Sequence, residues 1–164
     1  MQCIEKLGSI ALPKNLKDDT LKHSTQTQRN GAHGVTCLHL MSRPQEAFDA
    51  LQETGIHFTD EDRKQFLTGQ FLRATPLKMH NDAHIGVAYG ILVMVGVPPG
   101  AKIHQTTGES FELNEGDVFS IRYRFNHSLE MKEDERLLFI SVDFDRGSKS
   151  FHDSWFERIA NINN

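Results

Sequence analysis

Residues 88–122 read AYGILVMVGVPPGAKIHQTTGESFELNEGDVFSIR, and this stretch decides the fold. Short apolar runs alternate in it with three turn signals, Pro98-Pro99-Gly100, Thr107-Gly108 and Asn114-Glu115-Gly116. Many short strands at such spacing predict a mainly β protein, and a jelly roll is the natural architecture. We expect strands at 70–74, 88–95, 101–105, 110–113, 117–122 and 136–144.

The segment before this region is predicted to be partly irregular and partly helical. Residues 1–34 are polar, and we expect them to form an irregular extension, followed by a short strand at 35–40. Two helices are expected at 42–55 and 59–67, because each starts at a serine or threonine that can cap the first turn.

The end of the chain is predicted to be a helix packed on the sheet. Between residues 151 and 162, four large apolar side chains recur at helical spacing. With 164 residues, the chain has room for one compact domain. We therefore expect a single domain 1–164, with N-terminal extension and helices at 1–68, the β core at 69–145 and the C-terminal helix at 146–164.

Composition excludes several classes of protein. The net charge is −4 with acids and bases interspersed, which is unlike a nucleic-acid groove. The longest apolar run, around 91–97, is too short to cross a bilayer, and residues 1–6 lack the features of a signal peptide. We expect a cytoplasmic protein without a membrane or nucleic-acid partner. Cys3 and Cys37 lack metal-site spacing and are expected to be reduced thiols.

One histidine pattern carries chemistry. His80 and Asp82 are two residues apart, His127 lies in a later segment, and Arg136 starts an apolar strand. Two imidazoles and one carboxylate on one face of a metal form the triad of non-haem Fe(II) oxygenases, which leaves positions open for a 2-oxo acid and dioxygen. The fork of donors on Arg136 suits the distal carboxylate of 2-oxoglutarate. The pattern predicts an Fe(II) centre at His80, Asp82 and His127, with 2-oxoglutarate as co-substrate.

These segments resemble the aspartyl/asparaginyl β-hydroxylases, a branch of the 2-oxoglutarate oxygenases. The resemblance runs from about Gly69 to Asp145 and rests on five motifs, which are Gly69-Gln70-Phe71, His80, 99–103, 115–127 and 136–143. It implies a double-stranded β-helix (a cupin-like jelly roll), Fe(II), 2-oxoglutarate, and hydroxylation of an amino-acid-like or peptidyl substrate.

The sequence departs from that family at three places. Asp82 is a carboxylate that the characterised animal members lack, and it restores the general triad. Tyr89 and Ile91 stand where the family has an Arg and a His that contact the co-substrate, so Arg73 or Thr75 are the candidates to compensate. The pair Arg122 and Arg124 replaces acidic residues, and it would favour an anionic substrate if both side chains faced the pocket.

Two other readings of the same residues stay open. A metal-binding cupin without oxygenase activity, such as an isomerase or a small-molecule sensor, also has a Gly116-Asp117-Val118-Phe119 motif followed by a histidine. A non-enzymatic β-sandwich would leave His80, Asp82, His127 and Arg136 scattered. His84 is expected to be a loop residue or a neighbour of the iron site, and His104 to face outward from its strand.

Overall fold

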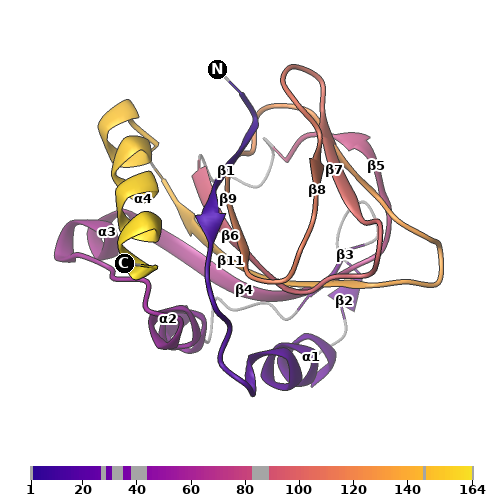
Figure 1. Cartoon of the computed structure of the whole chain (residues 1–164), viewed down its shortest axis with the longest axis horizontal. Coiled ribbons are helices and arrows are strands. Elements are labelled where there is room, and N and C mark those ends of the chain that lie inside the picture. The colour runs from indigo at the N-terminus through magenta and orange to yellow at the C-terminus, as the bar shows by residue number, and fades with distance from the viewer. Residues whose placement is uncertain are drawn as a thin grey trace.

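The chain folds into two antiparallel sheets that face each other, as the computed structural model in Figure 1 shows. The structure describes residues 2–26, 29–30, 35–37, 44–82, 89–145 and 147–163. Within these ranges the strand order is β1-β9-β6-β11-β4-β3-β2 in the larger sheet and β5-β10-β7-β8 in the smaller one. The mainly β, jelly-roll fold expected from the sequence is confirmed.

The larger sheet contains the long central strands. In spatial order its members are β1 (Ile4–Ser9), β9 (Asp117–Arg122), β6 (Tyr89–Gly96), β11 (Leu137–Phe144), β4 (Phe66–Ala74), β3 (Val35–Cys37) and β2 (Arg29–Asn30). The smaller sheet consists of β5 (Leu77–His80), β10 (His127–Glu130), β7 (Lys102–Gln105) and β8 (Phe111–Glu112). The helices are α1 (Leu16–Gln26), α2 (Pro44–Glu53), α3 (Asp60–Gln65) and α4 (Lys149–Ile162).

The helices lie on the face of the larger sheet that points away from β5, β7 and β8 (Figure 1). The side chains of β11 pack on both faces of the larger sheet. Its even-numbered residues from Leu138 to Phe144 pack in the helix-covered core, whereas Leu137 and Phe139 pack in the core between the sheets. Because side chains alternate along a strand, Ser141 and Asp143 also face the space between the sheets.

The helix ends follow from local chemistry. Thr59 and Asp62 form a reciprocal capping box at the start of α3, and the Ser148 hydroxyl accepts a hydrogen bond from the Phe151 amide at the start of α4. The apolar stripe expected near the C-terminus is confirmed, since Phe151, Trp155 and Ile159 are buried on one face of α4. Among the described residues, no helix is long and apolar enough to span a membrane.

The expectation of an irregular N-terminus was wrong for β1 and α1. Strand β1 pairs with β9, but a register shift between Lys6 and Gly8 breaks the alternation that would reveal it. Helix α1 turns Leu16, Thr20 and Ser24 inward, and the two hydroxyls bond to carbonyls of their own helix. Because two of the three buried side chains are polar, hydrophobic periodicity does not detect this helix.

Other boundaries differ by a few residues. The helix expected at 59–67, which is α3, ends at Gln65 because Phe66 already belongs to β4. Strands β5 and β10 were not among the expected strands, although they carry the two histidines of the site. They are four residues long, which is too short for a clear alternation of apolar and polar residues.

Candidate metal centre

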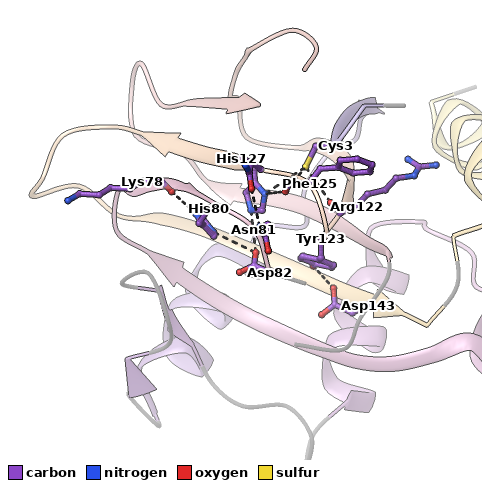
Figure 2. A network of polar contacts seen from close by, with 11 residues as sticks. Cys3, Lys78, His80, Asn81, Asp82, Arg122, Tyr123, Phe125, His127 and Asp143 are labelled. Atoms are coloured by element: carbon purple, nitrogen blue, oxygen red, sulfur yellow. Dashed lines mark hydrogen bonds and ion pairs between the residues drawn. The ribbon is translucent and has the colours of Figure 1, made fainter. Parts of the chain in front are cut away.

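His80, Asp82 and His127 lie together at one end of the smaller sheet (Figure 2). His80 ends β5 and His127 begins β10, and the two residues are direct partners in the antiparallel register. Asp82 follows β5, with Oδ2 at 3.6 Å from His80 Nε2 and 3.3 Å from His127 Nε2. One ligand atom from each residue lies within 4.8 Å of the other two. Three of the four residues that a non-enzymatic sandwich would leave scattered therefore lie together.

Main-chain carbonyls orient both imidazoles. His80 Nδ1 lies 2.6 Å from the Lys78 oxygen, and His127 Nδ1 lies 3.1 Å from the Phe125 oxygen. A carbonyl can only accept a hydrogen bond, so each Nδ1 acts as the donor there. This leaves the lone pair of the opposite nitrogen, Nε2, for a metal.

The donor set fits an iron ion. Two neutral imidazoles and one carboxylate on one side of a metal, with further positions open, suit non-haem Fe(II). The side chains of His80, Asp82 and His127 are 7%, 20% and 11% exposed, so the group is recessed without being closed off.

In the metal-free protein, His127 holds a proton firmly. Burial lowers the pKa of this imidazole, but hydrogen bonds with Asp82 and Cys3 outweigh burial and raise the pKa to about 9. Without a metal, the Asp82 carboxylate therefore stabilises the charged imidazolium of His127. A metal ion must displace that proton when it binds.

Cys3 is a neighbour of the site that sequence reasoning missed. Its buried thiol lies 3.7 Å from His127 Nδ1 and 3.4 Å from the carbonyl oxygens of Arg122 and Phe125. No spacing rule connects Cys3 with His127, because the contact spans 124 positions and depends on the pairing of β1 with β9.

The structure does not bring Arg136 into the triad. Its exposed guanidinium donates through Nη1 to the carbonyl oxygens of Glu133 and Glu135, within the loop before β11. The next residue, Leu137, takes the position that faces the core between the sheets. Thr75 follows Ala74, which pairs with Leu137, so Thr75 lies near Arg136 at the same end of β4 and β11. The Thr75 hydroxyl is 3.4 Å from the Pro76 oxygen.

The other predicted arginines are also directed elsewhere. Arg73 is opposite Leu138 in the sheet and so lies on the helix-covered face. Arg122 is buried on that same face, with its guanidinium 5.5 Å from the centre of the Tyr89 ring, and Figure 2 shows it pointing away from the triad. Arg124 is exposed and stacks over Phe125. An anion-binding role of the pair Arg122 and Arg124 in a common pocket is therefore not supported.

Two further histidines, His84 and His104, had expected positions. His104 is partly exposed on β7, where it contacts Ser110 and Glu130, as expected for an outward-facing residue. His84 lies outside the described residues.

Solved structures share this architecture. A prolyl-4-hydroxylase from Pseudomonas putida matches with a TM-score of 0.57 at 8% identity, covering 90% of this chain and 95% of that one. An oxidoreductase of the 2OG-Fe(II) oxygenase family from Burkholderia pseudomallei matches with a TM-score of 0.55 at 12% identity, covering 79% and 77%. The chain therefore shares its fold with these two enzymes.

A third neighbour was solved with metal and co-substrate. The epimerase SnoN, in complex with Fe3+, alpha ketoglutarate and nogalamycin RO, matches with a TM-score of 0.56 at 14% identity, covering 88% of this chain and 79% of that one. No protein-family model and no curated protein matches the chain. These likenesses do not show the narrower aspartyl/asparaginyl β-hydroxylase family, which stays a prediction.

Proposed function

We propose that this protein is a non-haem Fe(II), 2-oxoglutarate-dependent dioxygenase that hydroxylates an amino-acid-like or peptidyl substrate. The observation that carries the proposal is the convergence of His80, Asp82 and His127 at the end of a jelly roll. Structural neighbours of this fold that are described as 2OG-Fe(II) or alpha-ketoglutarate-dependent enzymes support the choice of co-substrate.

The three side chains would hold the metal, and the carbonyls of Lys78 and Phe125 keep the Nε2 lone pairs available for it. Fe(II), when bound, supplies the dioxygen chemistry that protein side chains lack. With only three protein ligands, a bound metal would keep coordination positions open for the co-substrate and oxygen.

The anchor for the distal carboxylate of 2-oxoglutarate is a separate part of the proposal. Arg136 can serve only if its guanidinium leaves the carbonyls of Glu133 and Glu135 and turns toward the space between the sheets. Replacing Arg136 by Ala would then raise the KM for 2-oxoglutarate while Fe(II) affinity stays unchanged. An unchanged KM would assign the anchor to another residue.

The function is tested by succinate formation and oxygen consumption with Fe(II) and 2-oxoglutarate, combined with an anaerobic Fe(II) titration. We expect turnover in the native protein and its loss in His80→Ala. His104→Ala is the matched control, because it removes a partly exposed histidine from the same sheet outside the triad. Native protein that neither binds Fe(II) nor consumes 2-oxoglutarate would overturn the proposal. Binding of several divalent ions without oxygen consumption would favour the non-oxygenase cupin.

A further inference from the structure

One turn of the chain supports two of the three metal ligands. Residues 123–126 connect β9 to β10, and the turn is closed by a hydrogen bond from the Phe125 amide to the Arg122 oxygen. The Tyr123 carbonyl accepts a hydrogen bond from the main-chain N–H of Asp82 at 2.8 Å, while the Phe125 carbonyl orients His127. The position of this turn therefore affects both the carboxylate ligand and one imidazole ligand.

The side chain of Tyr123 fastens that turn to the larger sheet. Its hydroxyl donates to Asp143 Oδ1 on β11 at 2.5 Å, and the Ser141 hydroxyl lies 3.4 Å from both Asp143 oxygens. Figure 2 shows the ring extending from the turn toward Asp143, away from the imidazoles. Tyr123 is 7% exposed and Asp143 is 1% exposed.

Gly90 makes room for this contact on the neighbouring strand. A Cβ atom at Gly90 would lie 2.5 Å from the Tyr123 hydroxyl oxygen and 2.7 Å from Asp143 Oδ1. Both distances are shorter than any real contact of a Cβ atom, so a larger residue at position 90 would push the pair apart.

Stability alone does not explain a carboxylate at this position. Burial raises the pKa of Asp143, which the hydrogen bonds from Tyr123 and Ser141 partly offset, and the resulting pKa is about 7. An apolar pair of similar volume would fill the same space without the cost of desolvating a carboxylate. A directed hydrogen bond, in contrast, fixes the position of the tyrosine ring and of the turn that bears it.

We infer that Tyr123 and Asp143 are positioning residues of the metal centre: their hydrogen bond fastens the turn that holds Asp82 and orients His127. The inference rests on the metal site of the proposed function. It adds two residues outside the set of three metal ligands, and it assigns their effect to the geometry of those ligands.

The test compares two buried tyrosines that contact the larger sheet, by Co2+ titration of the whole protein. Tyr123→Phe removes the hydroxyl that reaches Asp143, whereas Tyr89→Phe removes an equally buried hydroxyl that bonds to His152 on the opposite face. We expect Tyr123→Phe to weaken Co2+ affinity by about tenfold, as the loss of an outer partner of a ligand does, and to change the visible absorption spectrum of bound Co2+. Tyr89→Phe should leave both unchanged.

Asp143→Asn is the conservative variant, because the amide oxygen still accepts the hydrogen bond of Tyr123. It should bind Co2+ within about twofold of the native protein, whereas Asp143→Ala should resemble Tyr123→Phe. Thermal unfolding of each variant separates a loss of folding from a loss of metal affinity.

Two results would overturn the inference. Native affinity and an unchanged Co2+ spectrum in folded Tyr123→Phe would contradict it while leaving the proposed function intact. Failure of the native protein to bind any divalent ion would remove the metal site, and with it both the inference and the proposed function.

Discussion

Two buried tyrosines on opposite faces of the larger sheet have different roles. On the helix-covered face, the Tyr89 hydroxyl bonds to His152 Nδ1 of α4 at 2.7 Å, and the other nitrogen of His152 contacts Glu5 of β1. On the inner face, Tyr123 bonds to Asp143 and carries the turn that supports the metal ligands. Burial is the main cause of a raised pKa in both hydroxyls, and the Asp143 carboxylate raises the pKa of Tyr123 further.

The difference lies in what each network connects. The Tyr89 network joins a helix and the first strand to the sheet, so its loss should act on stability. The Tyr123 network joins the larger sheet to the turn that supports Asp82 and His127, so its loss should lower metal affinity. One sheet therefore separates a face that maintains the fold from a face that maintains the site, and substitutions on the two faces should have separable effects.

Trp155→Ala should give the largest effect and should act on stability alone. Trp155 is fully buried between α4 and the larger sheet, and its ring contacts those of Phe58, Phe144 and Phe151. We expect the free energy of unfolding in denaturant to fall by about 3–5 kcal/mol. Folded Trp155→Ala should keep native Co2+ affinity, and a clear loss of affinity would contradict the separation of the two faces.

The pH dependence of metal affinity should report on His127, which belongs to the inner face. The pKa of His127 is about 9 in the metal-free protein, so below that pH metal binding releases one proton. Affinity should therefore rise about tenfold per pH unit from near neutral pH and level off above about pH 9. Co2+ titrations across this range measure it, and an affinity independent of pH would show that His127 is not protonated.

The same pKa has the opposite consequence for the stability of the metal-free protein. A histidine whose pKa is higher in the folded chain than in the unfolded chain stabilises the fold fully below the unfolded value of about 6.5. That stabilisation should be lost as the pH rises through about 9. Thermal unfolding after removal of metal with a chelator should show this decline, and Asp82→Asn should reduce it.

Ser148→Ala should give the smallest effect, on the helix-covered face. It removes the hydroxyl that caps the Phe151 amide at the start of α4, and we expect a loss of about 1 kcal/mol in the free energy of unfolding. Ser148→Asn retains a capping oxygen and should stay close to native stability. A change of Co2+ affinity in Ser148→Ala would show that α4 is coupled to the site.

The triad was predictable from the sequence because three residues of distinctive type, His80, Asp82 and His127, make up the whole set of ligands. His80 and Asp82 are two residues apart in the chain, and only the register between β5 and β10 was needed to add His127. The jelly roll followed from turn signals, which are local.

The direction of Arg136 was not predictable at that level. A shift of one residue along a strand moves a side chain to the opposite face, and Leu137 instead of Arg136 faces the space between the sheets. The contacts of Cys3 and Tyr123 were missed for a related reason. They depend on pairing between distant strands, and neither residue type is unusual at its position.

The pairing of β1 with β9 also bears on how the protein is made. Ile4 lies opposite Ile121, and Cys3 reaches His127 over 124 positions of the chain, so these contacts must wait until β9 and β10 have left the ribosome. Contacts between distant segments form slowly, because the loop between them must first close. During synthesis, β1 therefore remains without its partner until β9 is translated, and completion of the candidate metal site is a late event in folding.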